Sequence, residues 1–352
     1  MSNLESVTDH GEEPDLVDDN VLSIRKPYLV FLGDVTSLAE AKTGIGVREW
    51  AAESCVAQWR TSSTVDLELP DMRPAEAYAA GARTLLIGVS TVGGALPPSW
   101  TPYLLEALEA GLDIVSGFHQ RLADTAILAQ TARRLGRVLH DVRHSKQQFS
   151  VATGRKRTGK RVLMVGTDCA LGKKYTALAI ARALCARGID ANFRATGQTG
   201  IMIAGGGIAI DAVVADFIAG AAEALTPDAR PDHWDVIEGQ GALFHPAYAG
   251  VTLGLLHGSQ PDALILCHDP LRTVTHWYPD YTLPSVEQAM AAYLPLARRT
   301  NPDARFVGIS LNTSSMTDEE MRRYVDTLAP LGLPICDPMR FGVDAVIDEV
   351  LS

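Results

Sequence analysis

The chain has 352 residues, of which 47% are hydrophobic and 21% are charged, and its formal net charge is −11. Residues 1–20 contain seven acids and no Lys or Arg, so the remainder, with 31 basic and 35 acidic residues, carries a charge of only −4. The length is enough for two domains, and a mildly acidic body does not favour nucleic acid or an anionic membrane as the main partner.

Residues 1–24 predict a disordered acidic tail, because they lack the basic start and the apolar core of a signal peptide. No apolar run approaches the roughly 20 residues that are needed to cross a bilayer. The five cysteines are scattered and form no C-x-x-C pair, which is typical of a protein from a reducing cytoplasm without structural zinc. We therefore expect a cytoplasmic protein without a metal centre, and a homodimer or higher homo-oligomer from general frequencies alone.

Residues 25–150 predict a Rossmann-like domain. Apolar runs at 28–34, 84–89 and 113–116 read as strands, and they alternate with helical patterns at 51–60, 101–110 and 122–135. This alternation is typical of a parallel sheet with helices on both faces. His119 directly follows the third strand, where it could line the cleft between the domains; the alternative is a plain loop role.

The polar and basic stretch 151–160 predicts a solvated linker. Residues 161–352 predict a second α/β domain, of the P-loop NTPase-like kind. Strands are expected at 162–165, 190–194, 234–237, 263–267 and 306–311, and helices at 175–187 and 211–221. Polar residues follow several of these strands, and the carboxyl ends of parallel strands meet at one edge of a sheet, so we expect a site there.

The strongest motif is RVLMVGTDCALGKKYTA at 161–177. An apolar strand, a glycine-bounded turn, Gly-Lys and an alanine-rich helix together form a cradle for phosphates. Lys174 stands where the usual P-loop has the Ser or Thr that ligates Mg²⁺, which favours phosphates that are held but not transferred, as in coenzyme A. The predicted cofactor-binding residues are Gly166, Thr167, Asp168, Cys169, Ala170, Leu171, Gly172, Lys173 and Lys174.

Three residues are candidates for acid–base catalysis. Glu238 ends an apolar strand in DVIEGQG, where it could act as a general base, ligate a metal or bond structurally to the amides of the glycine turn. Asp168 is placed to work beside it, and His245 in GALFHPAYAG is a further acid or base. Cys169 offers an acyl-cysteine intermediate, although small residues in such turns more often only allow close packing.

Five further residues form the predicted substrate-binding set. Arg194 and Arg272 follow strands at the expected site edge, where either could clamp a carboxylate through two hydrogen bonds; the alternative is a surface ion pair. His268 ends a strand, and its alternative is a structural role. Gln198 and His119 complete the set.

The long motifs resemble one family of two-domain proteins. GTDCALGK, ATGQTGIMIAGGGIAIDAVVADF, IEGQGALFHPAYAG and the segment at 117–122 are similar to proteins long catalogued as a domain of unknown function and now associated with D-glutamate N-acetyltransferase activity. The resemblance covers nearly all of residues 28–345. It implies an enzyme that uses acetyl-CoA to N-acetylate D-glutamate in D-amino-acid breakdown, on a P-loop NTPase-like fold.

Other functions stay open. GTD-x-x-x-GK followed by EGQG is also similar to dethiobiotin synthetase, which implies an ATP-dependent ligase or kinase with Mg²⁺ held by Glu238 and Asp168. A nucleotide-sensing protein without turnover is a third hypothesis. The expected partners are an amino-acid substrate and CoA, with no nucleic acid and no membrane.

Overall fold

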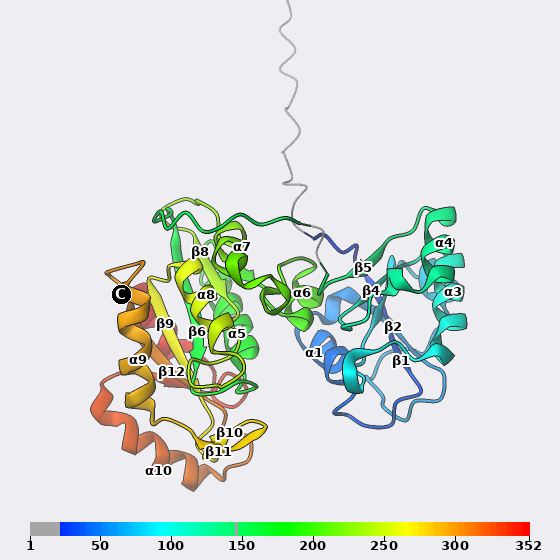
Figure 1. Cartoon of the computed structure of the whole chain (residues 1–352). Coiled ribbons are helices and arrows are strands. Elements are labelled where there is room, and N and C mark those ends of the chain that lie inside the picture. The colour runs from blue at the N-terminus through cyan, green and yellow to red at the C-terminus, as the bar shows by residue number, and fades with distance from the viewer. Residues whose placement is uncertain (1–21, 145–146) are drawn as a thin grey trace, which may run out of the picture.

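The computed structural model describes residues 22–144 and 147–352, so nearly all of the predicted tail at 1–24 lies outside the described residues. Two parallel sheets with helices packed around them form two lobes (Figure 1). The α/β fold class predicted from the sequence is confirmed. No helix of the described chain combines the length and apolar character that crossing a membrane requires.

The first sheet has five parallel strands in the order β2-β1-β3-β4-β5. From β1 the chain crosses to one side and from β3 to the other, so a crevice is expected at the carboxyl ends of these two neighbours. The strands are β1 (Tyr28–Gly33), β2 (Cys55–Arg60), β3 (Thr84–Ile87), β4 (Asp113–Ser116) and β5 (Leu139–Asp141). The helices are α1 (Lys42–Trp50), α2 (Pro74–Ala79), α3 (Thr101–Glu109) and α4 (Ala126–Leu135).

The second sheet has six parallel strands in the order β13-β12-β9-β6-β8-β7. These are β6 (Lys160–Gly166), β7 (Ala191–Arg194), β8 (Trp234–Ile237), β9 (Ala263–His268), β12 (Arg305–Leu311) and β13 (Ile335–Cys336). An antiparallel hairpin, β10 (Val274–Thr275) and β11 (Tyr278–Thr282), leaves the sheet after β9. The helices are α5 (Lys173–Ala186), α6 (Gln198–Ala204), α7 (Ile218–Leu225), α8 (Ala249–Ser259), α9 (Val286–Arg298), α10 (Asp318–Leu328) and α11 (Asp344–Leu351).

Two sequence predictions of helices are wrong. The segment predicted as a helix at 51–60 is mostly strand β2, an edge strand that buries Ala57 and Trp59 and leaves Arg60 half-buried. The helix α7 starts at Ile218 rather than at Asp211, because two short 3₁₀ turns precede it. In both places tertiary packing overrides a short apolar pattern.

Helix α6 belongs to the second sheet by sequence but packs into the core of the first lobe. Ile201 and Met202 are buried among the side chains of β1 and β3. The hydroxyl of Tyr28 donates a hydrogen bond of 2.8 Å to the carbonyl of Met202, and Lys26 Nζ donates one of 2.7 Å to the carbonyl of Ile203. One hydrophobic cluster therefore contains residues of both lobes, beside the second lobe's own core.

Helices α1 and α5 make a second contact between the lobes. The rings of Trp50 and Tyr175 stack with 5.9 Å between their centroids, and the guanidinium of Arg182 lies 4.7 Å from the Trp50 ring. Arg182 also donates to the carbonyl of Trp50. This contact places the C-terminal end of α1, at Trp50, alongside α5.

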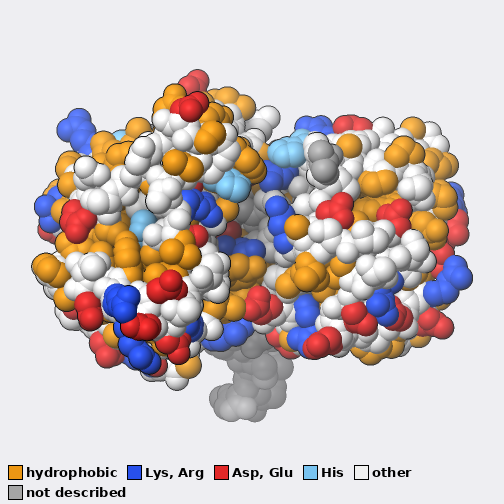
Figure 2. Space-filling model, turned by 90° about the horizontal axis from the view of Figure 1, so that it is seen from below, with side chains coloured by type: hydrophobic (Ala, Val, Ile, Leu, Met, Phe, Trp, Pro, Cys, Tyr) orange, Lys and Arg blue, Asp and Glu red, His pale blue; other side chains and the backbone are white. Residues whose placement is uncertain are grey.

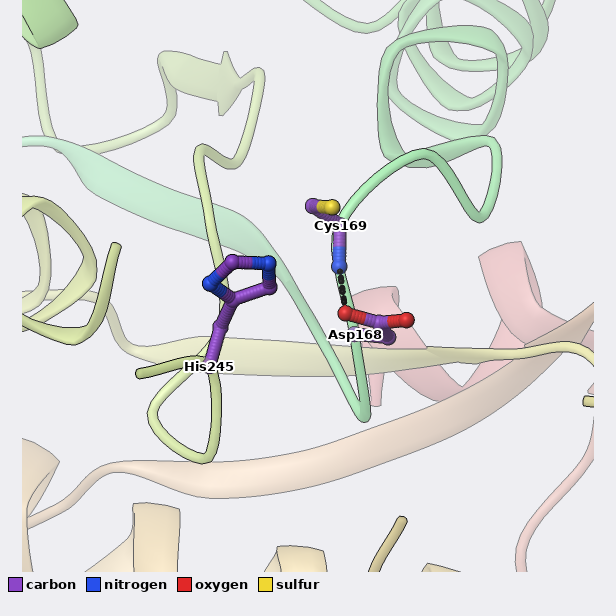
Figure 3. A group of neighbouring side chains, drawn as sticks. All are labelled: Asp168, Cys169 and His245. Atoms are coloured by element: carbon purple, nitrogen blue, oxygen red, sulfur yellow. Dashed lines mark hydrogen bonds between the residues drawn. The ribbon is translucent and has the colours of Figure 1, made fainter. Parts of the chain in front are cut away.

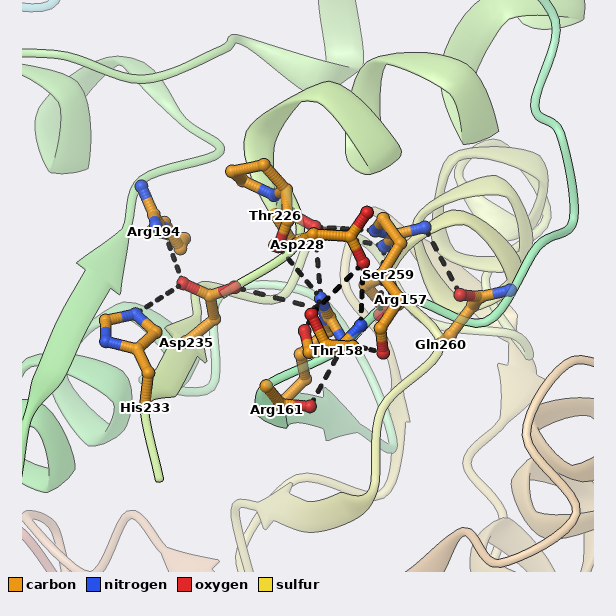
Figure 4. Close-up of polar contacts among 12 residues, drawn as sticks. Arg157, Thr158, Arg161, Arg194, Thr226, Asp228, His233, Asp235, Ser259 and Gln260 are labelled. Carbon is orange, nitrogen blue, oxygen red and sulfur yellow. Dashed lines mark hydrogen bonds and ion pairs between the residues drawn. The ribbon is translucent and has the colours of Figure 1, made fainter. Parts of the chain in front are cut away.

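The basic stretch before β6 is mostly exposed, as predicted for a solvated linker, but Arg157 within it and Arg161 in β6 are buried (Figure 4). The guanidinium of Arg157 is buried, and it donates to the carbonyl and hydroxyl of Thr226 and to the carbonyl of Gly258. Arg161 is fully buried and lies 3.8 Å from the carboxylate of Asp235. Burial lowers the pKa of Arg157 to about 10. These side chains anchor the segment to the second lobe.

Candidate active site

The phosphate-binding turn has the backbone geometry that the sequence predicts. It joins the buried strand β6 to α5, and Gly172 caps the helix with φ 102°, a conformation that glycine adopts without strain. Among the described residues, none accepts a hydrogen bond from the backbone N–H groups of Ala170, Leu171 and Gly172. Donors of this kind at the positive end of a helix form a site for an anion.

Lys173 closes this turn from the inside. Its ammonium donates a 2.8 Å hydrogen bond to the backbone carbonyl of Asp168, and burial lowers the pKa of the group. The Lys173 stem also packs so closely on Gly239 that a Cβ there would lie 2.9 Å from Cδ. A Cβ there would also overlap the backbone carbonyl of Met164 in β6, so this glycine of the EGQG motif is required first by the close approach of that strand and then by the lysine.

Asp168 and Arg272 support the turn instead of facing a substrate. The Asp168 carboxylate is fully buried and accepts from the Cys169 amide, the His276 amide and the Arg272 guanidinium. Arg272 also donates to the carbonyls of Cys169 and Ala170. In this arrangement the two side chains pair with each other, and the catalytic role predicted for Asp168 and the carboxylate clamp predicted for Arg272 stay predictions.

His245 lies against Asp168 and Cys169 (Figure 3). The possible ligand atoms of these three residues all lie within 4.8 Å of one another. Nδ1 of His245 accepts from the Ala247 amide, so its Nε2 carries the hydrogen and donates to the carbonyl of His276 at 3.3 Å. The ring is therefore held in one orientation, in contact with the turn.

A carboxylate, a thiol and an imidazole are a donor set for a transition metal. Both oxygens of Asp168 and both nitrogens of His245 already take part in protein hydrogen bonds. The arginine beside Asp168 also supplies the positive charge that a metal ion would bring. The cluster therefore fits internal hydrogen bonding better than a metal.

Glu238 lies at the start of α6, buried at 5% exposure. Its Oε2 accepts from the amides of Thr196 and Gly197 at 2.9 and 3.1 Å, which matches the structural alternative weighed for this residue. Burial raises its pKa, while the two amides and Lys174 act in the opposite direction. A buried carboxylate with a raised pKa is suited to accept a proton near neutral pH.

Lys174 is predicted to bind the cofactor at the phosphate turn, but its ammonium lies beside Tyr175 and α1. Its ammonium lies 4.5 Å from the centroid of the Tyr175 ring, and a Cβ on Gly46 of α1 would lie 3.5 Å from it. Charge interactions link it to Glu238, Glu49 and Lys42, and burial lowers its pKa. Lys174 thus belongs to the boundary between the lobes.

Two other predicted substrate ligands have structural partners. Arg194 donates at 2.6 Å to Asp235, a carboxylate exposed by only 1%. His268 is bonded through Nδ1 to the hydroxyl of Thr167 at 2.9 Å, stacks on Tyr324, and has a pKa lowered by burial. Each side chain therefore has a structural partner, and the substrate-binding roles predicted for Arg194 and His268 stay predictions.

Gln198 and His119 lie where the lobes meet. A Cβ on Gly117 would lie 2.9 Å from Gln198 Cγ, so the carboxyl end of β4 packs directly on the start of α6. His119 is exposed, and its carbonyl accepts from His144. Their roles in binding stay predictions.

The sequence analysis missed two features of the site. Helix α1 was not predicted, and the hairpin β10–β11 carries the exposed Trp277, whose ring lies 6.5 Å from that of Tyr248. Figure 2 shows a hollow between the lobes with basic and histidine side chains on its walls. The G-x-G spacing in α1 and the cluster of aromatic residues after His268 are the signals that were available.

The comparisons with known proteins agree with the motifs. A model described as the DUF1611_N Rossmann-like domain matches residues 55–145, and one described as the DUF1611_C P-loop domain, a domain of unknown function, matches residues 150–347. These matches confirm the predicted order of a Rossmann-like and a P-loop domain.

Two curated relatives are each named D-glutamate N-acetyltransferase. The protein from Tritonibacter scottomollicae is 50% identical over 331 residues, which is 94% of this chain and 99% of that protein. The one from a Pseudoalteromonas species is 45% identical over 328 residues, which is 93% and 99%. The predicted resemblance to this family is confirmed.

A solved structure shares the whole architecture. The crystal structure of a DUF1611 family protein from Anabaena variabilis superimposes with a TM-score of 0.81 at 32% identity, covering 93% of this chain and 99% of that one. With this structure, both domain matches and the two full-length relatives in agreement, the chain belongs to the DUF1611 family, which also includes these D-glutamate N-acetyltransferases.

Proposed function

We propose that this chain is an N-acetyltransferase that moves the acetyl group of acetyl-CoA to the amine of D-glutamate. The observation that carries the acceptor and the reaction is the identity of 50% and 45%, over nearly the full length, to two proteins named for that activity. The donor is supported by the turn at 166–173, whose free N–H groups suit the diphosphate of CoA, and by the lack of a Ser or Thr at position 174.

Glu238 is the proposed proton acceptor. The ammonium of the acceptor must lose a proton before its nitrogen can attack the thioester carbonyl, and the raised pKa of Glu238 suits that step. The amine adds to the thioester carbonyl, and the C–S bond breaks as the tetrahedral adduct collapses. The second proton, which the nitrogen loses on becoming an amide, passes to the CoA thiolate, which leaves as the thiol, and Glu238 returns the first proton to solvent. Oε2 is held by two amides, so the orientation of the carboxylate is fixed.

The acetyl donor decides between this function and an ATP-dependent ligase or kinase. We expect the purified protein to release free CoA thiol when it is given acetyl-CoA and D-glutamate, and mass spectrometry to detect N-acetyl-D-glutamate. EDTA is expected to leave the rate unchanged, and ATP with Mg²⁺ not to replace acetyl-CoA. Turnover that needs ATP and Mg²⁺ would instead favour the ligase.

A further inference from the structure

The acetyl transfer described above assigns no role to Lys174. Its side chain runs past the ring of Tyr175, and its ammonium lies in the space between α5 and α1. Within 22–144 and 147–352 it forms no hydrogen bond and no ion pair. A half-buried ammonium that faces an aromatic ring and no hydrogen-bonded anion is available to a ligand that supplies one.

The neighbouring charges do not neutralise Lys174. Oε2 of Glu238 accepts hydrogen bonds from two backbone amides, and the side chain of Glu49 is exposed to solvent. A second cation, Lys42 at the exposed start of α1, is close enough to interact electrostatically with both Lys174 and His276. The space therefore has a positive wall with the single buried carboxylate of Glu238 beside it.

Lys174 and Lys42 lie near the crevice at the carboxyl ends of β1 and β3, a position where ligands bind in open α/β sheets. Lys42 is the first residue of α1, the helix that follows β1, and the crevice between β1 and β3 opens at this end of the sheet. The hydroxyl of Thr43 lies 3.5 Å from that of Ser90 after β3 and 3.4 Å from that of Thr199 in α6. These hydroxyls join the crevice of the first lobe to the start of α6, next to Glu238. The first turn of α1 contains no acid, so its positive end is not neutralised.

We propose that Lys174, with Lys42 across the domain boundary, binds the side-chain carboxylate of the acceptor and so selects an amino dicarboxylate. This subsite rests on the proposed function and names the residues that give it acceptor specificity. The pattern of charges matches the ligand, because two cations face the carboxylates while Glu238 faces the ammonium. Arg194 and Arg272, which are bound elsewhere, do not compete for this role.

The test compares D-glutamate with D-glutamine, which has the same shape but one fewer charge. We expect K174M to lower kcat/KM for D-glutamate by about 30- to 100-fold through KM, since a hydrogen bond between charged groups is worth about this factor. For D-glutamine the change is expected to stay within about threefold, and KM for acetyl-CoA within about twofold. K174R should recover part of the preference, and K42M should show a smaller loss in the same direction.

Lys160 provides the matched control. It lies at the amino end of β6, away from the turn, and packs on Trp234, so K160M should leave both acceptors unaffected. Thermal unfolding of each variant checks that the fold is intact, and K174Q replaces K174M if the latter does not fold. A rise in KM for acetyl-CoA would make Lys174 a phosphate ligand, and equal losses for both acceptors would also overturn the subsite.

Calorimetric titration of D-glutamate separates the subsite from the proposed function. If wild type binds D-glutamate better than D-glutamine and K174M abolishes this preference, the subsite stands even if no acetylated product forms. If product forms but the preference persists in K174M, the function stands and the subsite is wrong. If D-glutamate neither binds nor reacts, both proposals are wrong.

Discussion

The carboxylate of Asp168 and the guanidinium of Arg272, 104 residues apart in sequence, meet at 3.1 Å beneath the phosphate-binding turn. Arg272 also donates to the carbonyls of Cys169 and Ala170, so it fixes the backbone whose N–H groups face the ligand. The shape of the turn therefore depends on the side chain of Arg272, which lies in the segment after β9.

Replacing Arg272 by Met is expected to weaken donor binding. The buried carboxylate loses its charged partner, which costs roughly 3 kcal/mol of stability, and the turn loses two of its supports. We expect KM for acetyl-CoA to rise at least tenfold and the melting temperature to fall. R323M removes only an exposed pair with Glu319 and serves as the control. An unchanged KM for acetyl-CoA in R272M would contradict the supporting role.

Glu238→Gln should separate activity from stability. As a general base the carboxylate is worth about 10²- to 10⁴-fold in rate, so kcat should fall by that factor and the acidic limb of the pH–rate profile should disappear. A glutamine oxygen can still accept from Thr196 and Gly197. Full activity in this variant would exclude Glu238 as the proton acceptor.

The stability of the same variant has a predictable pH dependence. Burial raises the pKa of Glu238 above its unfolded value of about 4.5, so the folded state binds this proton more tightly than the unfolded state does. The stability that the group contributes is therefore lost as pH rises from 4.5 through the folded pKa. Relative to wild type, E238Q should gain stability between pH 5 and pH 8 in thermal unfolding. A constant difference across that range would contradict a raised pKa.

Gly46 tests the contact between the lobes. A Cβ there would lie 3.3 Å from Thr199 Cγ2 and 3.5 Å from Lys174 Nζ, so Gly46→Leu should push α1 away from α6. We expect a lower kcat and a higher KM for the acceptor, with donor binding retained in a titration with CoA. Gly250→Ala, in α8 with open space around it, should instead stabilise the protein by up to about 1 kcal/mol.

Variants of Asp235 and Arg194 distinguish a structural role of Arg194 from a role in substrate binding. Asp235 is buried between Arg194, Arg161 and His233, so D235A should cost about 3 kcal/mol in chemical denaturation by leaving Arg161 without a counter-charge. R194M should leave KM for D-glutamate within about twofold of wild type. A tenfold rise in that KM would restore the clamp predicted from the sequence.

Cys169→Ala is expected to retain most of the activity. Burial, followed by the charge of Asp168, raises the pKa of the thiol, so Cys169 is protonated at neutral pH and a poor nucleophile. Intact-mass measurement after mixing with acetyl-CoA should show no added acetyl group. A 42-dalton adduct (about the mass of one acetyl group) that is absent from C169A would revive the acyl-cysteine route.

The sequence predicts the structure correctly where a feature is formed by residues that are contiguous in the chain. The strand, turn and helix around Gly172 are contiguous, so their pattern predicts the phosphate cradle. The partners of Arg194 and Arg272 could not be predicted, because Asp235 and Asp168 are brought to them by strand order and by the chain after β9. Helix α1 was missed because Gly44 and Gly46 weaken its pattern; a Cβ at Gly44 would lie 3.2 Å from the carbonyl of Gly88.

The way in which α6 enters the first lobe has a practical consequence. Residues 150–352 expressed alone would present Ile201 and Met202 to water, and the first lobe alone would leave the Tyr28 hydroxyl without the Met202 carbonyl. Although the chain divides into two recognisable domains, each domain alone would expose apolar surface and would be prone to aggregate. Gene truncations, crystallisation trials and directed evolution should therefore treat the whole polypeptide as the smallest workable unit.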